Sequence, residues 1–440
     1  MTMTFETLTN EVAALLEIDA DGVGPDTWLL DWGLDSLRLM TLVEQLRAHG
    51  SDVTFMDLAE APTLEGFARA LGIGREAPTF SLVGPEHTVL AQSDGQRFDD
   101  VLADHLVWRP KLERHLAATG GIAVGALPFA QDARVDLRCP TSFTVEDSAS
   151  AQTVPRCAPE RLVDDDPVFA ASVERALEAI ATGALDKVVL ALARDEELGP
   201  LRAQDILEAL RTENGDAYVF HAALGGTRHL LGASPELLVA RRGRRFVSRP
   251  LAGTAPRSRD DIEDRDRAAR LERSAKDLRE HRYVVDAIAA ALRPLARDVS
   301  IEPPRVVATP TVWHLESRIE GELASPEVSA LQLALALHPT PAVCGVPADA
   351  ARRWIEDSER FDRGFFTGTL GWVDASGDGE WVVAIRCAAL QDGVARLYAG
   401  AGIVAGSIAR DEVREVHAKL TTVRSALRRA RSHDSTQDEV

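Results

Sequence analysis

The stretch KDLREHRYVVDAI occupies residues 276–288, and helical spacing places Asp277 and Glu280 on one face of it. That face continues into the apolar positions Val284 and Ile288, so the two carboxylates extend a core-facing stripe. Burying an unpaired charge is costly, so carboxylates on such a stripe need a partner. The stretch therefore predicts a helix whose first turns carry carboxylates that need a partner, with a solvated, salt-bridged face as the alternative.

A second stretch, EVREVHAKL at residues 412–420, repeats the pattern far along the chain. Glu412 and Glu415 lie three residues apart, and Lys419 follows Glu415 by four. These side chains border an apolar stripe, and the same spacing is typical of a solvated, salt-bridged helix face. Two facing helices of this kind would instead supply the carboxylates that Mg²⁺ binds together with water and an anionic substrate. The spacing alone leaves both interpretations open.

Length and charge limit the class of protein. With 440 residues, 45% of them hydrophobic, the chain can bury a large core and is expected to form two or three folded units. The net charge of -20 opposes binding to nucleic acid or to an anionic membrane surface. No run approaches the roughly 18 apolar residues of a membrane helix, and the acidic N-terminus lacks the basic residues of a secretory signal. We expect a cytoplasmic protein.

The four cysteines, Cys139, Cys157, Cys344 and Cys387, are scattered without CxxC spacing. This spacing indicates neither a zinc site nor a disulfide framework. We expect reduced thiols in the core.

The first 73 residues form a distinct acidic segment, with 13 acidic and 3 basic side chains. Apolar residues recur at helical spacing and predict three helices. Their apolar positions are Leu8, Val12, Leu15 and Leu16, then Leu39, Val43 and Leu46, and after Pro62, Leu64, Phe67 and Leu71. Ser36 falls at the start of the second helix, where either Asp35 or Ser36 could serve as the N-cap.

The segments WGLDSLRLM at 32–40 and VTFMDLAEAPTLEGFARAL at 53–71 make residues 1–73 resemble an acyl carrier domain, most closely the aryl carrier domains of siderophore assembly. The resemblance implies a helical bundle in which Ser36 carries a covalent 4'-phosphopantetheine. A helix N-terminus suits the attached phosphate, because its free N–H groups and dipole favour negative charge. The implied partners are a phosphopantetheinyl transferase, an aryl-acid adenylating enzyme and nonribosomal peptide synthetase modules, whose basic faces would suit the acidic surface.

Residues 74–78 have the composition of a linker, residues 79–430 form the large domain, and 431–440 are a polar tail expected to be disordered. Short apolar runs within the large domain predict strands. They are KVVLALA, YVFHAAL, ELLVARR, RFVSRPLAG, GTLGWVDA, EWVVAIRCAAL and VARLYAGAGIV, and TFSLVGPEHTVLAQ at its start predicts a hairpin. These runs cluster instead of alternating regularly with helices, which favours an α+β fold.

Ten segments of the large domain occur in an order that resembles the chorismate-utilising enzymes, relatives of anthranilate synthase component I, and among them the isochorismate synthases. The segments are LDKVVLAL, LLGASPELL, RPLAGTAPR, KDLREHRYVVDAI, WHLESRIEG, ALHPTPAVCG, FDRGFFTG, VVAIRCA, YAGAGIV and EVREVHAKL. The resemblance implies two large sheets faced by helices, a Mg²⁺ requirement and conversion of chorismate to isochorismate.

That reaction adds water at C2 of the ring and expels the C4 hydroxyl, so it needs a base, an acid and a clamp on a dianion. By the resemblance, Lys187 is the base, and its pKa must be lowered by desolvation and the metal charge. Glu236 is the acid and must stay protonated at neutral pH. Without the surrounding motifs, Lys187 would be an ordinary lysine beside a strand and Glu236 a surface glutamate after a proline.

The resemblance also assigns the metal and substrate residues. Glu280 and Glu415 bind Mg²⁺ directly, and Asp277 and Glu412 hold its waters. The substrate-binding positions are Gly253, Thr254, His314, Ala342, Phe366, Arg386, Gly400, Gly402 and Lys419. Among these, Arg386 and Lys419 are the cations assigned to the pyruvyl carboxylate, because the planar guanidinium matches a carboxylate with two hydrogen bonds.

Two departures and two alternatives accompany this assignment. Val416 stands where the family commonly has threonine, and Thr367-Gly368-Thr369 replaces an AGPV-like stretch. A salicylate synthase, which goes on to eliminate pyruvate, would carry HPSVTASG-like residues where this chain has HPTPAVCG at 338–345. A carrier or scaffold protein with an inert large domain is the other alternative, and the joint presence of all the reacting groups argues against it.

Overall fold

The structure is a computed structural model that describes residues 5–20, 23–24, 27–49, 51, 53–59, 61–71, 78–92, 95–148 and 165–435. The chain divides into two compact units, Met1–Ala77 and Pro78–Val440, which we treat separately. Most of the expected linker, the last five residues of the expected tail and Cys157 lie outside the described residues. Residues 431–435 continue a helix, so this half of the expected tail is ordered in the structure. None of the described helices combines the length and apolar character that a membrane span requires.

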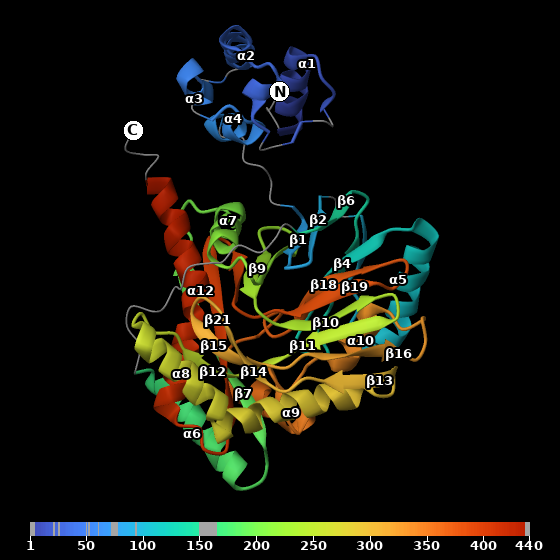
Figure 1. The fold of residues 1–440 in the computed structure, drawn as a ribbon, viewed down its shortest axis with the longest axis vertical. Coiled ribbons are helices and arrows are strands. Elements are labelled where there is room, and N and C mark those ends of the chain that lie inside the picture. Colours follow the sequence, from blue (N-terminus) through green and yellow to red (C-terminus); the bar gives the residue numbers. More distant parts are fainter. Residues whose placement is uncertain are drawn as a thin grey trace. The chain divides into compact units, whose positions relative to one another are not determined.

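The small unit is a helical bundle (Figure 1). Its elements are α1 (Phe5–Leu16), the 3-10 helix η2 (Leu29–Trp32), α2 (Ser36–Ala48), α3 (Phe55–Ala59) and α4 (Leu64–Ala70). The three predicted helices are α1, α2 and α4, and Leu8, Leu46 and Phe67 from their apolar positions are fully buried in one core. The sequence did not predict α3 and η2, because elements this short span too little sequence for a periodic pattern.

The large unit contains two nine-stranded sheets and one three-stranded sheet (Figure 1). The first sheet orders its strands β17 (Gly345–Val346), β7 (Lys187–Glu197), β21 (Val394–Val404), β20 (Cys387–Gln391), β9 (His229–Ser234), β8 (Tyr218–Ala223), β1 (Phe80–Val83), β2 (His87–Ala91) and β6 (Phe143–Asp147). The second orders β13 (Ala296–Ile301), β16 (Ile319–Leu323), β11 (Arg245–Arg249), β10 (Leu237–Arg242), β19 (Gly379–Val383), β18 (Thr369–Asp374), β4 (Ile122–Leu127), β5 (Asp136–Cys139) and β3 (Gln96–Phe98). The third is β12 (Leu251–Pro256), β15 (Val312–Glu316) and β14 (Arg305–Ala308). Antiparallel sheets with helices on their outer faces confirm the predicted α+β class.

Helices cover the outer faces of the two large sheets. They are α5 (His105–Thr119), α6 (Pro167–Ala181), α7 (Ala203–Glu213), α9 (Ala275–Leu292), α10 (Ala330–Leu337), α11 (Ala348–Ser358) and α12 (Ala409–Ser435), with a 3-10 turn η3 (Leu102–Asp104) before α5. A further helix, α8 (Asp261–Arg273), packs on the three-stranded sheet. One core joins the first sheet to α6, α7, α11 and α12, and a second joins the second sheet to α5, α9 and α10. A third core lies between the sheets, where Phe220 of β8 packs with Trp372 of β18. The unit is therefore layered as helices, sheet, sheet and helices.

Two runs predicted as single strands are each divided between sheets. RFVSRPLAG breaks at Pro250, which lacks the N–H that a strand interior needs, so β11 joins the second large sheet and β12 the small one. EWVVAIRCAAL breaks before β20, and Arg386 there adopts a left-handed φ of 52°. The chain leaves the second sheet at β19 and enters the first at β20. The single-strand predictions were wrong because sheet membership depends on distant partners.

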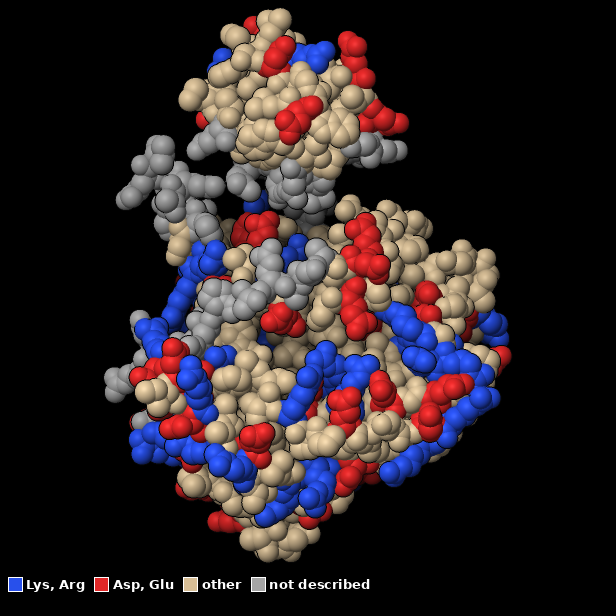
Figure 2. Space-filling model, viewed as in Figure 1, with Lys and Arg blue, Asp and Glu red and all other residues tan. Residues whose placement is uncertain are grey.

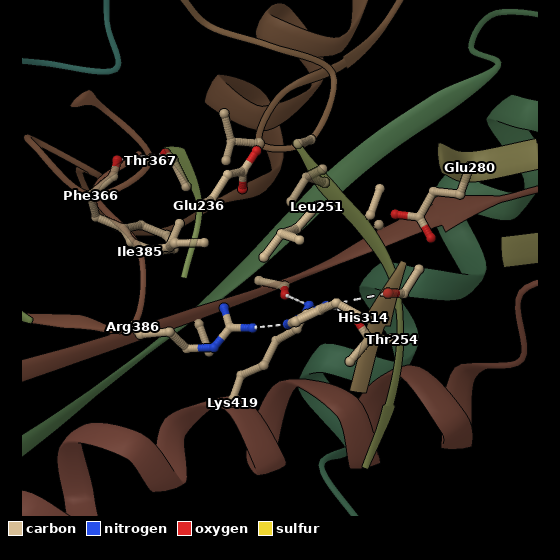
Figure 3. Close-up of a pocket in the computed structure, with 18 residues that line it drawn as sticks. Glu236, Leu251, Thr254, Glu280, His314, Phe366, Thr367, Ile385, Arg386 and Lys419 are labelled. Carbon is tan, nitrogen blue, oxygen red and sulfur yellow. Dashed lines mark hydrogen bonds between the residues drawn. The ribbon is translucent and has the colours of Figure 1, made fainter. Parts of the chain in front are cut away.

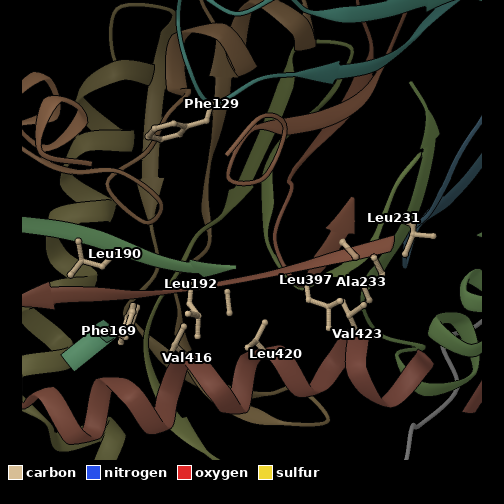
Figure 4. Packing of buried hydrophobic residues seen from close by; sticks show 14 of the residues in the cluster. Phe129, Phe169, Leu190, Leu192, Leu231, Ala233, Leu397, Val416, Leu420 and Val423 are labelled. Atoms are coloured by element: carbon tan, nitrogen blue, oxygen red, sulfur yellow. The ribbon is translucent and has the colours of Figure 1, made fainter. Parts of the chain in front are cut away.

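Helix α12 packs along the long pair β7 and β21, which stay in register over their whole length (Figure 4). Val416, Leu420 and Val423 point from the helix into this core. Val416 is fully buried among apolar side chains, so its departure from the family's threonine lies in the packing layer. The three described cysteines, Cys139, Cys344 and Cys387, are free and buried, as expected.

We expect Leu420→Ala to lower the free energy of unfolding of the large unit by about 2–5 kcal/mol, because it removes a buried side chain from the interface that fixes α12. Chemical denaturation followed by circular dichroism measures this change. Arg428→Ala, at an exposed position of the same helix, is the control and should stay within about 0.5 kcal/mol of wild type. An equal effect of both substitutions would contradict the packing described here.

Candidate active site

A cavity in the large unit lies where β7, β12, β15, β21, α9 and α12 meet the loops between the large sheets (Figure 3). It brings together all nine predicted substrate-binding residues. They are Gly253, Thr254, His314, Ala342, Phe366, Arg386, Gly400, Gly402 and Lys419. Glu236 and Glu280 also line the cavity. The other predicted site residues of the large unit lie just outside this lining; they are Lys187, Asp277, Glu412 and Glu415. Lys187 pairs with Glu280, and Glu415 pairs with Lys419, so both contact residues of the lining.

Glu236 enters the cavity from the tight connection between β9 and β10 (Figure 3). Its side chain is 2% exposed, and burial raises the pKa of this carboxyl from 4.5 to about 7. A hydrogen bond from the Leu251 backbone and the charges of Lys187, Arg386 and Lys419 oppose that increase. A substantial fraction of Glu236 is therefore protonated near neutral pH, as a general acid requires.

His314 is held between a backbone carbonyl and a guanidinium. Its Nε2 lies 2.8 Å from Nη2 of Arg386, and its Nδ1 lies 3.2 Å from the Gly253 carbonyl and 3.1 Å from Oγ1 of Thr254. Arginine only donates, so Nε2 must accept and the proton sits on Nδ1. Burial, followed by the charges of Arg386 and Lys419, lowers the pKa of His314 well below its ordinary value. This imidazole is neutral and orients the guanidinium.

The strand break described above places Arg386 in the cavity wall. Burial lowers the pKa of Arg386 to about 10, although the carboxylates of Glu415 and Glu236 act against it. Lys419 of α12 donates to the Gly400 carbonyl at 2.9 Å and to Oε1 of Glu415 at 2.5 Å. The cavity thus has two fixed cations on the side away from Glu236 and Glu280 (Figure 3).

Glu280 approaches the backbone of Gly402 closely, so a side chain at position 402 would displace the Glu280 carboxylate. A Cβ on Gly402 would lie 2.0 Å from Oε1 of Glu280 and 3.1 Å from Cε of Lys187. Oε1 of Glu280 forms an ion pair at 3.0 Å with Nζ of Lys187, whose side chain is fully buried at the start of β7. This ion pair places Nζ of Lys187 beside Glu280, which lines the cavity.

The paired acids of α9 and α12 meet beside this ion pair. Lys276 lies among them, with Nζ 2.7 Å from Oε1 of Glu412 and 3.8 Å from Oδ1 of Asp277. Burial alone would lower the pKa of Lys276, but the carboxylates of Glu412, Glu415, Glu280 and Asp277 together raise it. The two predicted metal ligands, Glu280 and Glu415, and the two acids predicted to hold the metal's waters, Asp277 and Glu412, therefore share one electrostatic environment, although they come from helices far apart in the sequence.

Burial and mutual repulsion act on the carboxyls of this cluster. Burial, then the charge of Glu415, raises the pKa of Glu412 to about 7. Burial also raises the pKa of Asp277, with Glu280 and Glu415 adding to it against Lys276. For Glu280 burial acts upward as well, but neighbouring lysines outweigh it and hold the pKa of that carboxyl below its ordinary value. The alternative of a solvated surface face is therefore wrong for Glu412 and Glu415, both of which are buried.

The residue types of this cluster suit a hard divalent cation. Carboxylate oxygens are the ligands Mg²⁺ prefers, and Oε2 of Glu412 is buried without a hydrogen-bond partner in the described part of the chain. Among the described residues, no three His, Cys, Asp or Glu side chains converge as a formed metal site. The contacts explain this, because Glu280, Glu412 and Glu415 are each paired with a lysine.

Arg363 fixes one wall of the cavity, and our sequence reasoning did not single it out. Its buried guanidinium donates to the carbonyls of Val343 and Val189 and to Oγ1 of Thr367, and it pairs with Glu359. Three of these partners line the cavity. Thr367 has a left-handed φ of 60°, so this contact helps hold a strained residue at the site. A buried arginine of this kind has no sequence signal apart from its place in FDRGFFTG.

In the small unit, Ser36 is the exposed first residue of α2. Asp35 is the N-cap, and its Oδ1 accepts hydrogen bonds from the N–H groups of Leu37 at 3.0 Å and Arg38 at 2.8 Å. The Ser36 hydroxyl is therefore not used for capping. Leu37 and Met40 are exposed beside it, and acidic side chains are scattered over an otherwise largely uncharged face of this unit (Figure 2).

Comparison with protein families identifies both units. Residues 137–428 match the chorismate binding enzyme family, and residues 6–71 match the phosphopantetheine attachment site family. The first match covers most of the large unit and more than half of the chain.

Individual relatives agree with the family matches. Isochorismate synthase DhbC of Bacillus subtilis is 42% identical over 373 residues, which cover 79% of this chain and 93% of the relative. Vibriobactin-specific isochorismate synthase of Vibrio cholerae is 45% identical over 247 residues, covering 55% of this chain and 62% of the relative. A crystal structure described as a 2,3-dihydroxybenzoate-specific isochorismate synthase, DhbC from Bacillus anthracis, is 39% identical, with a TM-score of 0.75, and covers 80% of this chain and 97% of that one.

The pKa of Glu236 predicts a pH-dependent stability difference. Between pH 4.5 and about pH 7, Glu236 keeps its proton in the folded protein but loses it in the unfolded chain. The free energy of unfolding therefore falls as the pH rises through this window. Glu236→Gln removes this dependence, and relative to wild type it should gain up to about 3 kcal/mol between about pH 5 and about pH 8. Urea denaturation at the two pH values measures it. A stability difference that does not change with pH would show that Glu236 has an ordinary pKa.

Proposed function

The chain belongs to the chorismate-binding enzymes, and we propose that its large unit converts chorismate to isochorismate. The observation that carries the proposal is the buried, partly protonated Glu236, which shares one cavity with Arg386, Lys419 and Glu280. This arrangement pairs a proton donor with cations that suit an anionic ring compound.

The substrate is a dianion, and the cavity has two cationic side chains in its lining. Arg386 and Lys419 would bind the pyruvyl carboxylate, with His314 holding the guanidinium in place. Gly400 has no side chain, so a ligand can approach the backbone closely at this wall of the cavity. The Gly400 carbonyl also accepts a hydrogen bond from the Lys419 ammonium, which fixes the position of that cation. Ala342 and Phe366 supply apolar surface that excludes water from the ring.

Two groups would move the protons. Lys187 would accept the proton of the water that attacks C2, and Glu236 would donate a proton to the departing C4 hydroxyl. Atoms balance, because water enters and water leaves. Burial keeps Glu236 able to donate, whereas the amine of Lys187 must be neutral before it can accept a proton.

We propose that Mg²⁺ is held by Glu280 and Glu415, with Asp277 and Glu412 holding its waters. When bound, the ion would neutralise these carboxylates and offer a positive site for the ring carboxylate of the substrate. If Glu280 binds the metal ion, Lys187 loses the carboxylate that stabilises its positive charge.

The small unit would carry the aryl acid that is made downstream. We propose that Ser36 receives 4'-phosphopantetheine from a phosphopantetheinyl transferase, and that an aryl-acid adenylating enzyme then loads the thiol for nonribosomal peptide synthetase modules of siderophore assembly. The free, exposed position of Ser36 at a helix N-terminus supports this role.

Incubation of the protein with chorismate and Mg²⁺, followed by chromatography, should yield isochorismate. Lys187→Ala should lower kcat by at least about 100-fold, because it removes the general base. The control Lys111→Ala changes an exposed lysine and should leave turnover unchanged. Salicylate with pyruvate as products would favour the salicylate synthase alternative, and full activity of Lys187→Ala would remove Lys187 from its proposed role.

Incubation with coenzyme A and a phosphopantetheinyl transferase should add one phosphopantetheine to the wild-type protein, as measured by intact mass. Ser36→Ala should show no gain, because it lacks the hydroxyl that attacks coenzyme A. Ser51→Ala changes the other serine of the small unit and should be modified like wild type. An equal gain on Ser36→Ala would place the attachment elsewhere.

A further inference from the structure

Lysine is rare in this chain and is concentrated at one place. Only 4 of the 49 basic residues are lysines, at positions 111, 187, 276 and 419. The last three form ion pairs with Glu280, Glu412 and Glu415, respectively, at distances of 3.0, 2.7 and 2.5 Å. A chain that otherwise uses arginine has therefore kept compact ammonium groups where its buried glutamates meet.

Lys276 differs from the other two lysines because the proposed reaction gives it no task. Lys187 is the proposed base and Lys419 lines the cavity, whereas Lys276 does not line it. It lies in the first turn of α9 and reaches across to Glu412 of α12. Its side chain is 27% exposed, while that of Glu412 is 1% exposed. The cation is thus at the margin of the cluster, and the acid it neutralises is inside.

This placement suits a lysine that can dissociate from Glu412. Leaving an ionised carboxylate buried without its partner costs stability, so in the metal-free protein the ionised form of Glu412 needs a counter-ion. The lysine stem is flexible and its head binds as a single point charge, so it can turn toward solvent. An arginine would bind both carboxylate oxygens and be harder to displace. Here Oε2 of Glu412 has no partner within the described residues, so lysine leaves one oxygen available.

We propose that Lys276 is a built-in counter-ion of the acid cluster, which holds α9 to α12 in the metal-free protein and is displaced from Glu412 when Mg²⁺ binds. The proposal rests on the magnesium site of the proposed function. Its consequence is that the Lys276–Glu412 ion pair competes with the metal and sets the concentration at which the site fills.

Isothermal titration of the full chain with MgCl₂, without substrate, tests this competition. Lys276→Met keeps the length of the stem and removes the charge, so Mg²⁺ should bind about tenfold more tightly than to wild type. The metal-free variant should melt at a lower temperature than metal-free wild type, and added Mg²⁺ should raise its melting temperature by a larger amount. Lys276→Arg keeps the charge and should bind Mg²⁺ no more tightly than wild type.

The control is Lys111→Met, which removes the one lysine outside the cluster from an exposed position of α5 and should match wild type in both measurements. Unchanged or weaker Mg²⁺ binding by Lys276→Met would overturn the counter-ion proposal. Absence of Mg²⁺ binding by the wild-type protein and by all variants would instead overturn the magnesium site itself. The two failures are therefore distinguishable.

Discussion

Burial of opposite charges where α9, α12 and β7 meet is the constraint on which the site depends. Four carboxylates and three ammonium groups share this region, and each buried glutamate of the cluster contacts a lysine. Such groups are tolerated inside a protein only when they are paired. The helices and the strand must therefore keep their mutual positions, which the packing of α12 on β7 and β21 secures.

The chain's passage between sheets supplies the rest of the cavity. Arg386 reaches the site because the chain leaves one large sheet and enters the other at that point, with a left-handed residue at the crossing. Gly253 lies at an irregularity of β12 with a φ of 77°, opposite the strand that carries His314. These interruptions of regular pairing leave side chains and carbonyls free to face a ligand. Arg363 then ties the cavity-lining segments that contain Val189, Val343 and Thr367 to one another.

The two units contribute separate chemistry to one proposed pathway. The large unit would make the precursor of an aryl acid, and the small unit would carry that acid as a thioester. At the carrier position, Asp35 satisfies the helix N-terminus, which leaves Ser36 exposed for modification. Fusion in one chain supplies the two units in equal amounts.

The sequence by itself determined which residue types occur, at what spacing, and in which ordered motifs. Helical periodicity predicted α1, α2, α4 and α9, because apolar spacing is a local property. The resemblance of the ordered motifs assigned nine positions to substrate binding, and all nine line one cavity. Tertiary structure alone decided which strand joins which sheet, so the sequence did not indicate that the run before β20 is divided between sheets. The break at Pro250 has a local cause, the missing N–H, but the sheet that each half joins does not. Tertiary structure also decided which lysine pairs with which glutamate, which placed Lys276 at the acid cluster and Val416 in the core. These outcomes depend on contacts between residues that are far apart in the sequence, from about 65 to more than a hundred positions, and no local pattern encodes such contacts.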